Sequence, residues 1–325
     1  MKKYLLILLL SISQLFSQNT NLSGTWILDK TIYEDGNYLE INHPLFSNFT
    51  EYEFFSNNLK INGQKFNAKY YQNSIKLDYR ELMYSFQNEY LLVQEKGDNK
   101  IQIFLKKDDF ITKYPIFKSE QKILNQDTIY ISNEIFKPKF ENDLNFEDFL
   151  RKNIPSYNNA STKNNIFKSE FILTKENLIK DINITQGISK SFDNEFITVL
   201  KKAQTYFKNE TGKDLLIRHN FNFFKMFGAL TNKSEKDFYS IQKKAKEYFE
   251  KNEFEKAVSE YEKLNNINDL IILKEKFGFV YNEAFINLGI SYLALNKIEN
   301  ACSSFKKVGG FTNFSVRNYL IIYCN

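Results

Sequence analysis

Residues 166–186 read IFKSEFILTKENLIKDINITQ and form the clearest local pattern in this chain of 325 residues. Apolar side chains gather on one face of Ile166–Leu173 and on one face of Leu178–Gln186, as they do on half-buried β-strands. The intervening Thr174-Lys175-Glu176-Asn177 is typical of a turn. The pattern predicts an antiparallel hairpin whose apolar face lies on a core.

The segments around this hairpin predict a complete α+β domain. Apolar residues at helical spacing predict a helix over Phe192–Phe207, and a final strand is predicted over Leu215–Phe224. Upstream, the segment Phe136–Glu141 leads into a short predicted helix, Phe146–Ile154. The predicted order is therefore helix, strand, strand, helix, strand.

Residues 134–228 resemble the TonB carboxy-terminal domain in the order and length of these elements. Pro138, Gly187 and the Gly212-Lys213 turn fall where that family has a proline, a strand-breaking glycine and a Gly-Lys turn. The resemblance implies a non-catalytic domain that offers the edge of its final strand to a partner strand, with backbone hydrogen bonds supplying affinity. The candidate protein-binding residues of this strand are Leu215, Ile217, His219 and Phe221.

The last part of the chain, residues 236–325, is predicted to be helical and contains an internal repeat. Its pattern resembles tetratricopeptide repeats, in which small residues lie where two helices of a hairpin touch. An unrelated bundle of four or five helices is the alternative. Seven residues recur at identical spacings after an interval of 44 residues: Ala245, Tyr248, Asn252, Phe254, Ala257, Tyr261 and Leu264, then Gly289, Tyr292, Asn296, Ile298, Ala301, Phe305 and Val308.

The tetratricopeptide resemblance implies an inner groove lined by fixed positions of each first helix. Half of these side chains are apolar, which favours an occupied groove. The occupant is either an apolar peptide or another domain of this chain. The lining positions are Tyr239, Gln242, Lys246 and Phe249 in the first repeat and Glu283, Ile286, Ile290 and Leu293 in the second.

Residues 18–107 predict an antiparallel β-domain, and residues 108–133 a connecting segment. Short β-rich runs separated by turns predict a meander that curls into a barrel or half-barrel. Gly24-Thr25-Trp26 resembles the start of lipocalin-like domains; the alternative is a tryptophan packed in the core of another small β-domain. The predicted strands are Thr25–Leu28, Phe49–Phe55, Leu59–Asn62, Phe66–Tyr71, Ser74–Tyr79, Glu89–Glu95 and Lys100–Lys106.

Residues 1–17 have the features of a secretory signal peptide. Lys2 and Lys3 precede the apolar run Tyr4–Leu10, and a polar exit ends at Ser17. We expect cleavage after Ser17 and an exported chain without a transmembrane span, in the periplasm or at the periphery of the outer membrane of a Gram-negative bacterium. An uncleaved anchor is the alternative, although the apolar run is shorter than the roughly 20 residues that a span needs.

Cys302 and Cys324 are the two cysteines of the chain. An oxidising compartment favours a disulfide between them. On antiparallel helices joined near Gly309, however, the two residues would be offset by about 6 Å, near the limit of disulfide geometry. Two buried free thiols are therefore favoured, with the disulfide as the alternative.

The sequence predicts no catalytic residue, cofactor site or metal site. Basic and acidic residues, 44 and 39 in number, are interspersed and leave a net charge of +5 without a basic stretch, which argues against nucleic-acid binding. The two histidines lack partners for a metal site, since His43 is expected in a loop and His219 in the core. Nucleophile and phosphate-binding motifs are absent from the sequence.

We therefore predict a multidomain α+β protein that binds proteins or peptides of the cell envelope and catalyses no reaction. The partner would contact the edge of Leu215–Phe224 and the helical groove. Two alternatives come from other classes: a carrier of a small apolar ligand in the amino-terminal barrel, and a hydrolase with a site between domains.

Overall fold

The computed structural model describes residues 22–124, 126–161, 165–224 and 230–324. The predicted signal peptide lies outside these residues. The chain divides between Ile116 and Phe117 into two compact units, and each is described by itself.

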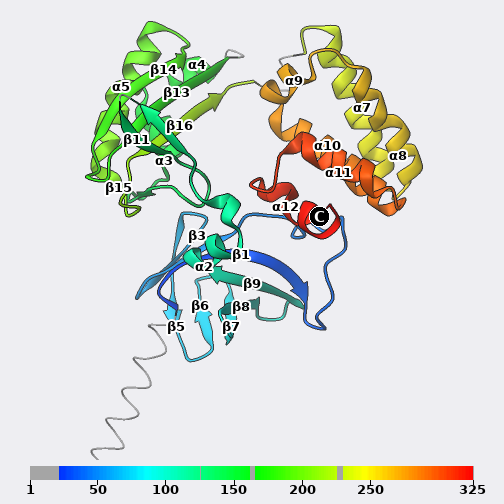
Figure 1. The fold of residues 1–325 in the computed structure, drawn as a ribbon, viewed down its shortest axis with the longest axis horizontal. Coiled ribbons are helices and arrows are strands. Elements are labelled where there is room, and N and C mark those ends of the chain that lie inside the picture. Colours follow the sequence, from blue (N-terminus) through cyan, green and yellow to red (C-terminus); the bar gives the residue numbers. More distant parts are fainter. Residues whose placement is uncertain (1–21, 125, 162–164, 225–229, 325) are drawn as a thin grey trace, which may run out of the picture. The chain divides into compact units, whose positions relative to one another are not determined.

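The first unit is a nearly closed antiparallel barrel (Figure 1). Within the described residues its sheet has nine strands, and each pairs with the next along the chain except at one break between β4 and β5. The first strand also pairs with the last, which confirms the predicted barrel-like sheet. The strands are β1 (Gly24–Tyr33), β2 (Glu51–Phe54), β3 (Asn58–Ile61), β4 (Gln64–Asn67), β5 (Lys69–Tyr70), β6 (Ser74–Lys76), β7 (Glu81–Gln87), β8 (Tyr90–Glu95) and β9 (Lys100–Lys106).

Alternating side chains of these strands fill the barrel interior. Trp26 is buried, and its indole N–H donates to the carbonyl of Leu22 over 2.9 Å. The rings of Tyr52 and Phe104 pack with their centroids 4.6 Å apart. The helix α2 (Lys107–Lys113) follows β9 and lies against β1 and β9. The interior is thus a packed core made of Trp26, Leu28, Tyr52, Phe54, Leu59, Ala68, Ile75, Leu77, Leu82, Tyr84, Leu91, Val93 and Phe104.

The second unit contains a sheet of five strands, counted over the described residues, in the order β10-β11-β16-β13-β14. The predicted hairpin is present as β13 and β14, and the predicted helix is α5, where the Ser189 hydroxyl accepts the N–H of Phe192 as a cap. A short pair, β12 and β15, lies outside this sheet. The elements are β10 (Gln121–Leu124), β11 (Asp127–Ile131), β12 (Lys139–Phe140), α3 (Phe146–Asn153), α4 (Tyr157–Ser161), β13 (Ile166–Leu173), β14 (Ile179–Gln186), α5 (Lys190–Ala203), β15 (Phe207–Lys208) and β16 (Leu215–Asn222).

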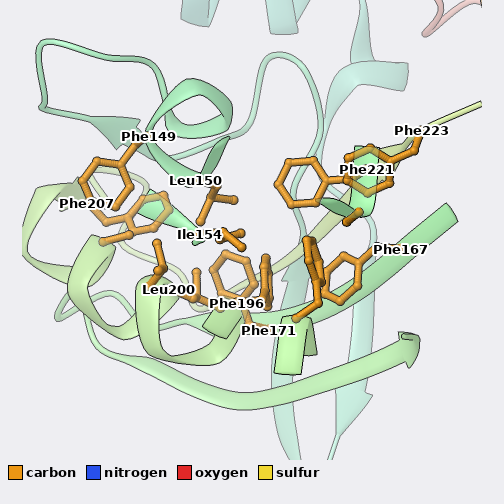
Figure 2. Packing of buried hydrophobic residues seen from close by; sticks show 14 of the residues in the cluster. Phe149, Leu150, Ile154, Phe167, Phe171, Phe196, Leu200, Phe207, Phe221 and Phe223 are labelled. Carbon is orange, nitrogen blue, oxygen red and sulfur yellow. The ribbon is translucent and has the colours of Figure 1, made fainter. Parts of the chain in front are cut away.

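An aromatic core joins this sheet to its helices, as Figure 2 shows. Phe167 and Phe171 of β13 pack with Phe196 and Leu200 of α5, and Phe221 of β16 belongs to the same cluster. The rings of Phe167 and Phe196 lie 4.6 Å apart. Because truncating one buried phenylalanine to alanine costs about 3–5 kcal/mol, this cluster holds β16 firmly in the sheet.

The helices of residues 233–323 include two hairpins with the same local geometry. Asn252 and Asn296, equivalent positions of the sequence repeat, both have a φ of 57° and follow the first helix of a hairpin. The next residue in each case donates its N–H to the carbonyl of a tyrosine, Tyr248 or Tyr292, over 2.9 and 2.8 Å. The sequence repeat is therefore also a structural repeat. The helices are α7 (Lys233–Glu250), α8 (Phe254–Tyr261), α9 (Leu270–Lys276), α10 (Gly278–Ala294), α11 (Ile298–Val308) and α12 (Phe314–Tyr323).

Cys302 and Cys324 form a disulfide, with their Cα atoms 5.7 Å apart. The preference for two free thiols was wrong. The 6 Å offset assumed that both residues follow the regular rise of a helix. Cys324 instead lies after the last residue of α12, where the backbone leaves the helix with a φ of −117°, so the helical rise does not fix its position.

Candidate functional site

The strand β16 lies inside the five-stranded sheet rather than at its border (Figure 1). It pairs with β13 over all of its eight residues, Leu215–Asn222, without a shift in register. On the other side β11 runs parallel to it, but only Leu215 and Leu216 are paired there. The predicted free edge is therefore wrong for the first two residues of the strand, because β11 of the same chain occupies them.

The strand β11 ends at Ile131, opposite Leu216, and the chain that follows it turns away from β16. The side-chain oxygen of Asn133 accepts the backbone N–H groups of Ile135 and Phe136 over 2.9 and 2.7 Å, which closes a tight turn. Among the residues that the structure describes, no strand pairs with this side of β16 after Leu216. We call residues 217–221 on this side of β16 the open edge.

The backbone of the open edge directs hydrogen-bonding groups away from β13. The carbonyl of Leu216 accepts the N–H of Ser132 over 3.0 Å and so points to the β11 side. Backbone groups of alternate residues point the same way along a strand. The N–H and C=O groups of Arg218 and Asn220 therefore face the open edge, where a strand from another chain would find them.

The predicted contact residues point into the core instead. Leu215 and Phe221 are buried, and Ile217 and His219 are partly buried on the same side of the sheet. Because alternate residues of a strand face opposite sides, these four side chains lie on the core side of the sheet, where the buried Leu215 and Phe221 are not accessible to a partner. The exposed side chains of the open edge are Arg218 and Asn220, which were not predicted as contact residues although the same alternation along the strand indicates them.

Two contacts limit the open edge and its exposed side chains. The guanidinium of Arg218 pairs with Glu170 of β13 over 2.8 Å. The side-chain amide of Asn222 donates to the carbonyls of Glu275 and Lys276 over 2.9 and 3.2 Å. The part of β16 that a partner strand could pair with therefore ends before Asn222.

The border strand β14, on the far side of β13 from β16, is less suited to a partner. The edge strand β14 has two register shifts against β13, and Asp181 within it adopts a φ of 49°. The neighbouring Lys180 adds a second exposed charge. Bulges and charges of this kind protect natural sheet edges from pairing, so the regular β16 is the better docking strand.

His219 lies in an aromatic environment, as predicted for a core residue. Its ring centroid is 4.5 Å from that of Phe221 and 5.3 Å from that of Phe146. Burial, with a smaller effect from the positive charge of Arg151, lowers the pKa of His219 to about 4. The imidazole is therefore neutral at physiological pH.

The predicted helical groove is partly filled by its own side chains. The carboxylate of Glu283 accepts a hydrogen bond from the amide of Gln242 over 3.0 Å and pairs with Lys246 over 2.7 Å. Ile290 is buried, which contradicts its prediction as an accessible contact residue. The remaining candidates, Tyr239, Phe249, Ile286 and Leu293, are partly buried.

A scan of protein-family models and searches of curated proteins and of solved structures found no match to this chain. No helix among the described residues has the length and apolar character that a membrane crossing requires. Within the same residues, no group of three or more His, Cys, Asp or Glu side chains is arranged to hold a metal ion.

Proposed function

We propose that this protein is an exported, non-enzymatic binding protein of the cell envelope that accepts an extended segment of a partner protein beside the open edge of β16. The observation that carries the proposal is a strand locked in regular register with β13 over eight residues, with the backbone groups of Arg218 and Asn220 left at its other side. Addition of a strand to such an edge is a recurring mode of peptide recognition.

The size of the open edge sets the expected affinity. Five residues span roughly 17 Å at about 3.4 Å per residue. Each backbone hydrogen bond contributes about 0.5–1.5 kcal/mol net, and association costs several kcal/mol. Backbone pairing alone therefore gives weak binding, so a partner must also contact the exposed polar side chains Arg218 and Asn220.

Two further observations support the proposal. The order of α3, β13, β14, α5 and β16 is the order that suggested the TonB carboxy-terminal resemblance. The disulfide between Cys302 and Cys324 suits an oxidising compartment outside the cytoplasm, in agreement with the predicted signal peptide.

The barrel interior weighs against the carrier alternative. Trp26, Tyr52, Phe54, Tyr84 and Phe104 occupy the space in which an internal ligand would lie. None of the residue arrangements in the candidate site favours the hydrolase alternative. In the helical groove, Gln242 and Lys246 already contact Glu283, and Ile290 is buried, so these three side chains are not available to a partner. The open edge therefore remains the leading site.

Peptide display against the whole protein tests the proposal. We expect the selected peptides to protect the backbone amides of Arg218 and Asn220 from hydrogen exchange. Asn220→Pro removes an N–H from the open edge without removing one that pairs with β13, so it should weaken binding at least tenfold. Asn220→Ala keeps the backbone donor and is the matched control. Protection elsewhere, or equal binding by the proline variant, would contradict the proposal.

A further inference from the structure

The first strand of the barrel contains a bulge at Asp29. In the pairing of β1 with β9, Leu28 faces Phe104 and Lys30 faces Ile103, so Asp29 is an extra residue between two consecutive pairs. Bulges re-aim side chains and are frequent beside functional sites. Here the bulge buries a carboxylate, since Asp29 is only 4% exposed.

The carboxylate of Asp29 holds a lysine of α2 in place. One of its oxygens pairs with the ammonium of Lys113 over 2.9 Å, and the other accepts the hydroxyl of Tyr114 over 2.6 Å. Lys113 also donates to the hydroxyl of Tyr90 over 3.3 Å. Burial by itself disfavours the charged form of Lys113, but the hydrogen bond and charge of Asp29 outweigh it and raise the pKa of Lys113. The lysine is a fixed cation.

A cavity of about 250 Å³ lies beside this cation on the outside of the barrel. Leu92 and Ile103 are the apolar residues of its lining, and Gln87 and Asn88 are two of its polar residues. It is therefore separate from the filled interior. The complete lining is Asp29, Lys30, Gln87, Asn88, Tyr90, Leu92, Ile103 and Lys113.

The charges of the lining favour an anion. The lining contains two lysines, Lys30 and Lys113, and a single carboxylate, that of Asp29, whose two oxygens already accept hydrogen bonds. Lys113 has three N–H groups, of which Asp29 and Tyr90 use two within the described part of the chain. Lys30 forms no ion pair among the described residues, and its ammonium lies 5.3 Å from the ring centre of Tyr38.

We propose that this cavity binds a carboxylate with a short aliphatic chain. The carboxylate lies between Lys30 and Lys113, and the chain lies on Leu92 and Ile103. At about 30 Å³ for each water-sized group, the cavity takes about eight non-hydrogen atoms, the size of hexanoate. A phosphate group would leave the apolar surface without a ligand contact. Two sources have this chemistry, a free carboxylic acid and the carboxy-terminal residue of a peptide.

Calorimetric titration of the whole protein with hexanoate tests the site. We expect hexanoate to bind at least tenfold more tightly than hexanamide, which has the same shape and no charge. Lys30→Gln should weaken hexanoate binding at least fivefold without changing the melting temperature. Lys65→Gln on β4 is the matched control, since Lys65 is exposed and lies outside the lining, and it should bind as the parent does.

A peptide ending in Ala-Leu with a free or an amidated terminus distinguishes the two sources. Tighter binding of the free peptide than of hexanoate assigns the site to chain termini, and weaker binding assigns it to free acids. Equal binding of hexanoate and hexanamide overturns the proposal, as does unchanged binding by Lys30→Gln or the absence of heat at millimolar hexanoate. None of these results depends on strand addition at β16.

Discussion

The imidazole of His219 lies among Phe146, Phe196 and Phe221, and its Nε2 atom is buried with no hydrogen-bond partner among the residues that the structure describes. Its pKa is about 4 in the folded protein, against an ordinary value of 6.5. As the pH falls, the unfolded chain therefore binds a proton before the folded chain does. The folded state loses stability progressively from about pH 6.5 down to about pH 4, by about 3 kcal/mol in total.

His219→Phe should remove this pH dependence, because phenylalanine fits an aromatic environment and does not titrate. We expect the free energy of unfolding of the variant to exceed that of the parent by a margin that grows from pH 7 to pH 4. Urea denaturation at several pH values measures it. His43→Gln, which changes the other histidine, should follow the parent. A margin that stays constant with pH would show that His219 does not cause the effect.

Gly289 of α10 lies against the ring of Phe305 of α11 in the second hairpin. A Cβ atom added there would lie 2.4 Å from a ring carbon of Phe305. Alanine favours helices by up to about 1 kcal/mol over glycine, but Phe305 is fully buried and cannot move away. We therefore expect Gly289→Ala to lower the free energy of unfolding by about 1–3 kcal/mol.

Gly310→Ala is the control for this substitution, because an added Cβ there meets no atom within 4 Å. Chemical denaturation of both variants measures the difference. A Gly289→Ala protein as stable as its Gly310→Ala counterpart would mean that the ring of Phe305 relocates without cost.

At the scale of elements, local patterns predicted most strands and helices of the fold. The hairpin β13–β14 and the helix α5 follow directly from the spacing of their apolar residues. The strand β7 (Glu81–Gln87) was missed, although Leu82 and Tyr84 alternate towards the core. The predicted run Phe66–Tyr71 is in fact two strands, β4 and β5, separated by the buried Ala68.

The candidate site was predicted only in part, because its neighbours are distant in the sequence. The position of β16 and the core location of His219 followed from alternation along one strand. The pairing of Tyr130 with Leu215 joins residues 85 positions apart, and nothing in either segment specifies that contact. The bulge at Asp29 could not be predicted for the same reason, because it is a shift in the register between β1 and the distant strand β9.

The disulfide ties the end of α12 to α11 across a separation of 22 residues. Closing a loop of this size stabilises a fold by about 3 kcal/mol. We expect the double variant Cys302→Ser, Cys324→Ser to lose about that much stability, measured by guanidinium denaturation. Reductant should destabilise the parent similarly and leave the double variant unchanged. A parent protein that is insensitive to reductant would contradict the expectation.

For the molecule as a whole, export and oxidation should depend on the same short segment. Expressed with residues 1–17, the chain should reach the periplasm with Cys302 and Cys324 protected from alkylation. Expressed from Gln18 after an added methionine, it should stay in the cytoplasm with both thiols reactive, because that compartment keeps thiols reduced. Alkylation followed by mass spectrometry measures the difference. Identical labelling of the two forms would remove the support for export.

The pairing of β1 with β9 has a consequence for the order in which the newborn chain acquires structure. Trp26 faces Lys106 across this pair, so the barrel cannot close until residue 106 has emerged from the ribosome or from a translocation channel. Bringing such remote segments together costs entropy. Until then, the strand Gly24–Tyr33 lacks its pairing with β9 and exposes unpaired backbone groups on that side. A chaperone would have to shield the incomplete barrel during this interval.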